Sequence, residues 1–373
     1  DITYAALLDA VEFDLRQSLR RIAELPLQNR HLSLSGGIDS RILTAAIIDE
    51  GLQDHFRFIT FGTPYRSDVI AARAIAHRFQ LDWAFVDHSE RSPDDERAEV
   101  RTHAALVEGM TNAWNAAGAT TFSGSLLVTG LVGEYVRWGK TSRAGMSVTT
   151  EAEMLALLRK NISLDPLGIV RPDVLEFYRG TIAHWAADQL ARGESLQQIP
   201  SYFNQSGQAR HRFAVTQAWG ERPTLTPFVT PTFVRANQQL PVEKRPDHRF
   251  QVDLMNRFQP ELALMPFAAQ GWSEEIIAHL PDADRYRAIA PIRTTDPEGH
   301  TWRVLRYRDY RPFLEEFLLD RSNPIHELID AERLQEALAT GDRHPGRTRR
   351  LWAVLTAAIW MGHHESTVRI RRI

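Results

Sequence analysis

The stretch "HLSLSGGIDSRILTAAI", residues 31–47, decides the predicted fold of this chain. Its first five residues have the composition of a short buried strand. The segment "SRILTAAIIDEG", residues 40–51, has the apolar spacing of a helix and ends at a glycine. Gly36 and Gly37 lie in the turn between them. Glycine lets the backbone turn tightly and approach a ligand closely, because it has no Cβ. The stretch therefore predicts a strand, a ligand-binding glycine turn and a helix.

The residues around the two glycines favour a phosphate or pyrophosphate as the ligand. The first N–H groups of a helix have no partner inside the helix, and the positive end of its dipole attracts anions. The hydroxyls of Ser35 and Ser40 add donors, and Asp39 beside a phosphate is best explained as a ligand of Mg²⁺. An ordinary strand-to-helix turn is the alternative. Neither the Walker nor the Rossmann glycine fingerprint fits this sequence.

Segments on either side of this stretch alternate between strand and helix patterns. Further strands are expected at residues 56–62, 81–87 and 125–130, with helices at residues 3–24, 67–79 and 94–116. Ser67 or Asp68 is expected to cap the helix at 67–79. Alternation with short connections predicts an α/β fold, in which helices flank both faces of a parallel sheet. In such a sheet ligands bind beyond the carboxyl ends of the strands, where the glycine turn lies.

The strand signals fade beyond residue 148. Helical patterns follow, separated by Pro-rich links such as "GERPTLTPFVTPTF", residues 220–233. These patterns cover residues 151–161, 173–191, 207–219, 247–258, 301–319, 326–339 and 348–362. We therefore predict an α/β domain over residues 1–148. An all-helical substrate or lid domain, packed on the first, is expected over residues 149–373.

The composition excludes several other kinds of site. The 373 residues carry a net charge of −3, without the basic excess that is typical of nucleic-acid-binding proteins. There is no cysteine, which excludes disulfides, thiolate zinc sites and cysteine nucleophiles. The longest apolar stretch, residues 351–362, is too short to span a bilayer, and the first residues lack the positive charge of a signal peptide. We expect a cytoplasmic protein with no membrane or nucleic-acid partner.

The hexapeptide "SGGIDS", residues 35–40, resembles the pyrophosphate-binding loop of the N-type ATP pyrophosphatases. Members of this superfamily use ATP to adenylate an oxygen of their substrate, and pyrophosphate leaves. Residues 58–79, 128–139 and 226–241 resemble segments of its asparagine synthetase branch, to which the β-lactam synthetases and the lasso peptide macrocyclases are related. The resemblance implies an α/β fold of the ATP pyrophosphatase type, similar to the adenine nucleotide α-hydrolases, with ATP and Mg²⁺ as cofactors.

The same resemblance implies the residues of the site. Asp39 and Glu134 are expected to hold Mg²⁺ and to be catalytic. Nucleotide binding is expected from Leu34, Ser35, Gly36, Gly37, Asp39, Ser40, Phe61, Asp68 and Gly130. Gln270 stands at about the position where the synthetases carry a lysine near the pyrophosphate, so this cation must come from elsewhere. Five residues are candidates for this cation. Lys244 and Arg249 are expected to be catalytic, and the others are Arg257, Arg137 and Lys140.

The resemblance also implies an activity, that of an AMP-forming ligase that makes an amide bond between an adenylated small-molecule or peptide carboxylate and an amine donor. Leu131 stands where the asparagine synthetases have Glu and the β-lactam synthetases have Tyr, which favours specialised biosynthesis of a lactam, a macrolactam or an asparagine-like amide. His103, Glu108 and Tyr135 are candidate general bases. A separate amidotransferase or precursor-binding partner is left open. The alternatives are a nucleotide-binding scaffold or inactive homologue, and an amidating ligase of the NAD or GMP synthetase type.

Overall fold

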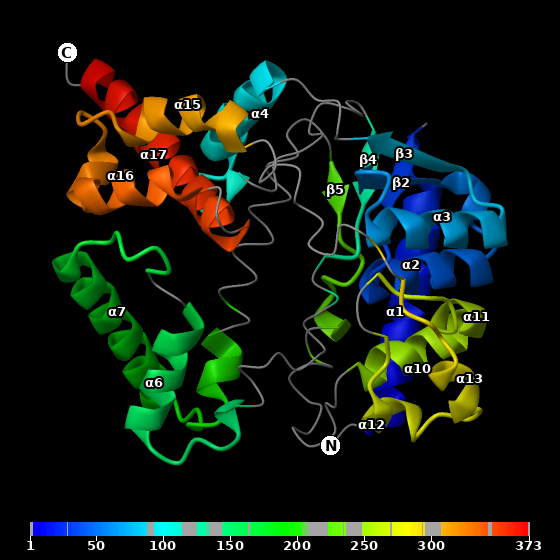
Figure 1. The fold of residues 1–373 in the computed structure, drawn as a ribbon. Helices are drawn as coiled ribbons and strands as arrows, with labels where there is room; N and C mark the ends of the chain where they lie inside the picture. The colour runs from blue at the N-terminus through cyan, green and yellow to red at the C-terminus, as the bar shows by residue number, and fades with distance from the viewer. Residues whose placement is uncertain are drawn as a thin grey trace. The chain divides into compact units, whose positions relative to one another are not determined.

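The chain forms two compact units, and each unit is assembled from separate segments of the sequence. Unit 1 comprises Asp1–Glu90, Thr120–Trp138 and Glu221–Gly299, and unit 2 comprises Arg91–Ala119, Gly139–Gly220 and His300–Ile373. The units therefore do not follow a single boundary at residue 148. The computed structural model (Figure 1) describes residues 3–27, 29–87, 93–113, 125–131, 133, 144–162, 165–203, 206, 223–233, 235, 248–268, 271–292, 294, 307–341 and 345–371.

Unit 1 is built around a parallel sheet of five strands in the order β3-β2-β1-β4-β5. The strands are β1 (Arg30–Ser33), β2 (Arg57–Gly62), β3 (Trp83–Asp87), β4 (Leu126–Val128) and β5 (Thr224–Leu225). This all-parallel sheet with its helices confirms the α/β prediction. Strands β2 and β3 extend the sheet on one side of β1, while β4 and β5 extend it on the other. The direction of winding therefore reverses between β1 and β4, which is where open α/β sheets bind their ligands.

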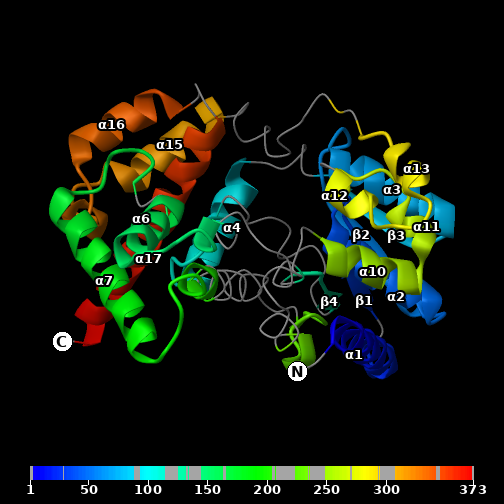
Figure 2. The same ribbon diagram turned by 90° about the horizontal axis from the view of Figure 1, so that it is seen from below.

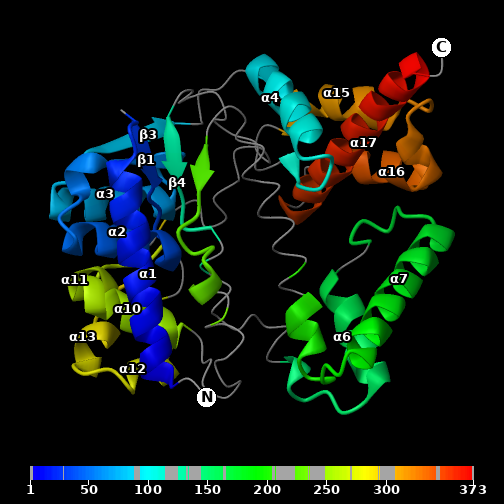
Figure 3. The ribbon, with the colours of Figure 1, turned by 180° about the vertical axis from the view of Figure 1, so that it is seen from behind.

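The N-terminal helix of unit 1 buries one apolar face. Helix α1 (Tyr4–Glu24) begins after Thr3, whose hydroxyl accepts a hydrogen bond from Ala6 N at 3.2 Å. Its buried residues recur at helical spacing, so one stripe faces the core. It packs against α2 (Ile38–Asp49) and α10 (Arg249–Phe258) (Figure 3). The unit also contains the helices α3 (Ser67–Phe79), α11 (Pro260–Ala263), α12 (Glu274–Ile277), α13 (Ala283–Arg287) and the short 3-10 helix η1 (Gln53–His55).

The expectation of an all-helical second half is wrong, because β5 joins the sheet. Leu127 N donates to Pro223 O at 2.9 Å, and Thr129 N donates to Leu225 O at 3.0 Å. A two-residue strand shows no periodicity, so the sequence pattern could not reveal it. Helices α10 to α13 also belong to the unit that contains the sheet. The segment between residues 221 and 299 therefore completes the α/β unit.

The described parts of unit 2 are mainly helical, with one isolated antiparallel bridge between Val170 and Ile329. The helices include α4 (Pro93–Leu106), α6 (Glu151–Ile162), α7 (Pro172–Ala191), α15 (Tyr307–Leu318), the 3-10 helix η5 (Pro324–Glu327), α16 (Ala331–Ala339) and α17 (Pro345–Arg371). Helices α4, α15 and α17 pack together (Figure 2). The rings of Tyr310 and Trp352 meet edge to face in their core, with centroids 5.6 Å apart.

Helix α4 ends earlier than the predicted helix at 94–116. Glu108 and Gly109 adopt φ angles of 50° and 68°, which an α-helix does not contain. The predicted helix at 207–219 lies outside the described residues. Among the helices that the structure describes, none combines the length and the apolar character needed to cross a membrane.

An ion-pair cluster joins α1 to the end of α2 and gives a first testable prediction. The Glu50 side chain is 5% exposed and binds Arg16 at 2.6 Å and also Arg20. Burial raises the pKa of the Glu50 carboxyl, but the hydrogen bonds from Arg20 and Arg16 outweigh burial and hold this pKa below its ordinary value of 4.5. The stability that this cluster supplies is therefore present above pH 4.5 and is lost as the pH falls further.

We expect the substitution Glu50→Gln to lower the free energy of unfolding at neutral pH by about 1 kcal/mol, since solvent screens part of the attraction. It should also flatten the loss of stability below pH 4.5. Chemical denaturation across this pH range measures both effects. The exposed Glu24, at the end of α1, provides the control substitution Glu24→Gln. Equal curves for the two variants would contradict the role of the cluster.

Candidate functional site

The turn after β1 is a compact loop, Leu34–Gly37, which we call the glycine loop. Two serine hydroxyls hold its shape. Ser35 N donates to Ser40 Oγ at 3.1 Å, Gly37 N donates to Ser35 Oγ at 3.1 Å, and the two hydroxyl oxygens lie 2.9 Å apart. The predicted strand, turn and helix are confirmed as local structure. The hydroxyls of Ser35 and Ser40 fix the loop to the first turn of α2.

The two glycines of the loop differ in what surrounds them. A Cβ at Gly36 would overlap the Cβ of Ala268 and lie 2.9 Å from the Cβ of Ala71, so packing inside the protein requires glycine there. At Gly37 a Cβ would meet, among the described residues, only the Ser35 hydroxyl at 3.2 Å, a contact that a shift of a few tenths of an ångström relieves. Gly37 also has φ −81° and ψ 165°, a conformation that any residue adopts. Neither packing nor conformation requires glycine at Gly37, whereas close approach of a ligand would.

Asp68 contacts the glycine loop instead of capping its own helix. Its Oδ1 accepts a hydrogen bond from Gly36 N at 3.0 Å, and its Oδ2 lies 3.2 Å from a guanidinium nitrogen of Arg66. The prediction that Ser67 or Asp68 caps α3 is wrong, because the cap position is Arg66 and no side chain caps this helix end. Since a protein carboxylate binds the Gly36 N–H, an anion at the loop would meet the first N–H groups of α2.

The loop after β4 reaches the same helix start from the neighbouring strand. A Cβ at Gly130 would lie 2.8 Å from Ser40 N, and a Cβ at Gly133 would lie 2.7 Å from Asp39 Cγ. The half-buried Asp39 carboxylate therefore lies directly against bare backbone of this loop. Glu134, the next residue in the chain, lies outside the described residues. The structure thus brings Asp39 and the segment that leads to Glu134 together at the β1–β4 reversal.

Leu34 and Phe61 lie at the ends of β1 and β2, at the same edge of the sheet. Leu34 N donates to Ile59 O at 2.9 Å, and Leu34 O accepts from Thr60 Oγ1 at 2.7 Å. The same hydroxyl accepts from Trp83 Nε1 at 2.9 Å. These bonds tie the end of β1 to β2 and, through the Trp83 side chain, to the beginning of β3. The half-buried Phe61 lies near the end of β2 in this edge.

Arg41 is a buried cation that sequence reasoning missed. Its side chain is fully buried and donates to the carbonyl oxygens of Leu262, Met265 (2.8 Å) and Pro266 at the end of α11. Its guanidinium carbon lies 4.0 Å from the centre of the Phe267 ring. Burial lowers the pKa of Arg41 to about 9, although the charge of Asp68 opposes this shift. Arg41 therefore fixes the segment that carries Ala268 against the glycine loop.

Gln251 is a second residue that the sequence did not single out. It lies on α10, is 2% exposed, and places its Nε2 at 3.5 Å from Gly133 O. Helix α10 packs on α2, and the amide of Gln251 contacts Gly133, whose backbone lies against Asp39. A glutamine in an amphipathic helix carries no signal of such a position. Only the packing of the two helices reveals it.

The predicted cations have other partners in the structure. Arg249 Nε lies 3.5 Å from Asp253 Oδ2, and Arg257 binds Asp9 at 2.5 Å and Glu12 at 2.9 Å. Among the described residues neither arginine makes a hydrogen bond to the glycine loop. The other predicted residues Lys244, Gln270, Arg137, Lys140 and Tyr135 lie outside the described part of the chain. The cation expected near the pyrophosphate therefore stays a prediction.

The remaining base candidates lie in unit 2. His103 is buried, with Nε2 at 3.1 Å from Thr111 Oγ1, and Glu108 has the φ of 50° that ends α4. Both positions have a structural explanation within their own unit.

Leu131 is half-buried in the loop after β4, where its N–H donates to Thr129 Oγ1 at 3.4 Å.

The arrangement fits a phosphate group and a divalent cation. Gly37 offers bare backbone, the start of α2 offers N–H donors, and the Asp39 carboxylate supplies the oxygen ligand that Mg²⁺ prefers. Asp39 lies on α2 and meets a second glycine-containing loop, the one after β4, so the carboxylate is held by packing against this loop. A scan of the sequence against models of known protein families gives no match, and a search of curated proteins also gives none.

Proposed function

We propose that this chain is an ATP-dependent ligase that adenylates a substrate carboxylate and forms an amide. One observation carries the proposal: at the β1–β4 reversal, Gly37 leaves bare backbone at the start of α2, Asp39 lies in the first turn of this helix, and Gly133 closes on Asp39. Phosphate binding alone explains the glycines. A carboxylate in the first helical turn beside an anion is explained by a bridging metal ion.

In the proposed reaction, a carboxylate oxygen of the substrate attacks the α-phosphorus of ATP, and pyrophosphate leaves. An amine nitrogen then attacks the acyl carbon, loses a proton to a base, and expels AMP. Mg²⁺, when bound, would neutralise charge on the departing pyrophosphate. Asp39 would hold this ion together with Glu134, while Gly37 and the first N–H groups of α2 would receive the phosphates. The contribution of the chain to the first step is positioning and charge.

The edge beside the glycine loop supports the nucleotide part of the proposal. The backbone of Leu34 is fixed by hydrogen bonds to two residues of β2, and Phe61 lies on that neighbouring strand. A fixed strand edge with an aromatic side chain suits the flat adenine ring. Amide formation within one molecule, as in a lactam, and amide formation between two molecules both remain compatible with this geometry.

The test is to incubate the protein with Mg²⁺, radiolabelled ATP and a panel of amino acids and peptide acids, with amines and ammonia. AMP and pyrophosphate whose formation depends on one acid would support the ligase and identify its acyl substrate. ADP and phosphate would overturn the mechanism. ATP binding without turnover on every acid would favour the nucleotide-binding scaffold instead.

A further inference from the structure

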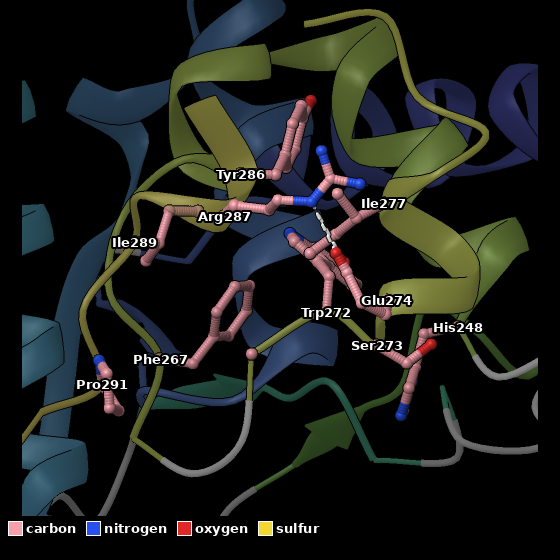
Figure 4. Close-up of a pocket in the computed structure, with 11 residues that line it drawn as sticks. His248, Phe267, Trp272, Ser273, Glu274, Ile277, Tyr286, Arg287, Ile289 and Pro291 are labelled. Carbon is pink, nitrogen blue, oxygen red and sulfur yellow. Dashed lines mark hydrogen bonds and ion pairs between the residues drawn. The ribbon is translucent and has the colours of Figure 1, made fainter. Parts of the chain in front are cut away.

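A pocket of about 620 Å³ lies in unit 1 on the segment that follows α11 (Figure 4). The described residues that line it are His248 and several residues between 267 and 291. The lining therefore comes from one stretch of the sequence, residues 248–291. Sites for small molecules have volumes of roughly 300–1,000 Å³, so this pocket is large enough for one. None of the residues proposed above for nucleotide binding lines it among those that the structure describes.

Three aromatic side chains contribute edges to the walls of the pocket, beside polar and charged residues. Phe267, Trp272 and Tyr286 are each less than 8% exposed. Trp272 Nε1 donates to Ala263 O at 2.9 Å, and Tyr286 OH donates to Asn256 Oδ1 at 2.9 Å. Since the polar atoms of both rings are bound within the protein, the rings offer apolar surface to a ligand. Such walls favour an apolar and preferably aromatic group.

Charges of both signs stand among the lining residues. Arg287 Nε lies 2.5 Å from Glu274 Oε1, and Arg287 Nη1 lies 3.0 Å from Asp284 Oδ1. The side chains of Arg287 and Glu274 are 46% and 64% exposed, so the pair stands where the pocket meets solvent. A ligand with an aromatic group inside and polar groups of both signs at the mouth would complement this arrangement.

We propose that this pocket binds an aromatic amino-acid side chain, either of a free amino acid or of a peptide. The ring packs on the pocket-facing edges of Phe267, Trp272 and Tyr286, and the amino-acid backbone lies at the Glu274–Arg287 pair. Phe267 precedes Ala268, whose N–H donates to Gly36 O at 3.2 Å, so the bound ring lies one residue from a contact with the glycine loop. The proposal does not rest on the ligase activity, and a binding measurement without ATP tests it.

The probes are L-phenylalanine and N-acetyl-L-phenylalaninamide, titrated into the full chain in a calorimeter, with L-alanine and N-acetyl-L-alaninamide as controls. Gly271 provides a variant that fills the pocket. Among the described residues a Cβ there would meet only Phe267, at the ordinary contact distance of 3.9 Å, so Gly271→Leu extends into the pocket without displacing described backbone. The matched control is Gly180→Leu on α7, where an added Cβ has no described atom within 4 Å apart from the backbone of its own helix. Ile289→Asp, at a half-buried position of the wall, is a second variant.

We expect at least one aromatic probe to bind, and its affinity to fall about tenfold or more in Gly271→Leu and in Ile289→Asp but not in Gly180→Leu. If L-phenylalanine binds more tightly than the capped probe, and this difference is lost in Arg287→Met, the ligand is a free amino acid. Equal or tighter binding of the capped probe would assign a peptide. Failure of both aromatic probes to bind would overturn the proposal. So would equal binding of the alanine probes, or unchanged affinity in folded Gly271→Leu and Ile289→Asp proteins.

Discussion

The substitution Asp39→Asn is expected to reduce AMP formation about 100-fold or more. The amide has nearly the same shape as the carboxylate, so it keeps the packing against Gly133 while it removes the negative charge. An uncharged oxygen is a much weaker ligand for Mg²⁺, and the charge of the leaving pyrophosphate is then poorly neutralised. The fold should tolerate the change. Loss of an acidic residue from the first turn of α2 costs about 0.3–1 kcal/mol of stability.

The same helix supplies the control for this prediction. Asp49 lies at the opposite end of α2 and pairs with Arg16, so Asp49→Asn should keep AMP formation near that of the unchanged chain. Initial rates over a range of Mg²⁺ concentrations provide the second readout. Asp39→Asn should need more Mg²⁺ for its residual rate, whereas Asp49→Asn should not. Full activity of Asp39→Asn at low Mg²⁺ would exclude Asp39 as a metal ligand.

The local structure around the glycine loop could be predicted because its signals lie within short windows. The predicted helix at 67–79 has the bounds of α3, and β1, β2 and β3 each lie within two residues of their predicted starts and ends. Apolar periodicity and the glycine and proline residues between segments carry this information. The parallel sheet follows from their alternation. Strand β5 could not be predicted, because two residues show no period and its partner β4 is almost a hundred residues away.

The parts of the site that sequence reasoning missed depend on long-range contacts with the backbone. Arg41 is the one basic residue of α2, but its acceptors are carbonyl oxygens more than 220 residues away. Every residue type carries a carbonyl, so no pattern marks these acceptors. The local pattern predicts a helix cap at Asp68, because acidic residues favour the start of a helix, while only the family resemblance places Asp68 among the nucleotide-binding residues. Its contact with Gly36 N instead depends on how β1 and α3 pack, which the local pattern does not encode.

The substitutions Gly36→Ala and Gly37→Ala are expected to separate packing from ligand binding at adjacent positions. A Cβ at Gly36 would collide with the Cβ atoms of Ala268 and Ala71, neither of which can rotate away. Overpacking of this kind costs about 3 kcal/mol, so Gly36→Ala should lower the free energy of unfolding by that amount. At Gly37 the added Cβ meets one hydroxyl at 3.2 Å in an ordinary backbone conformation. Gly37→Ala should therefore keep its stability within about 1 kcal/mol.

Nucleotide binding should respond in the opposite way to the two glycines. In Gly37→Ala a methyl group occupies the surface on which the phosphates would lie, so the Kd for ATP should rise about tenfold or more. Adding Ala268→Gly to Gly36→Ala removes the closest clash and should restore about half of the lost stability, which tests the packing explanation directly. Chemical denaturation and equilibrium ATP binding measure the two properties. A stable Gly36→Ala protein would disprove the packing role of Gly36. Unchanged ATP affinity in Gly37→Ala would mean that this open backbone is not where the phosphates bind, and would remove the main support for the proposed nucleotide site.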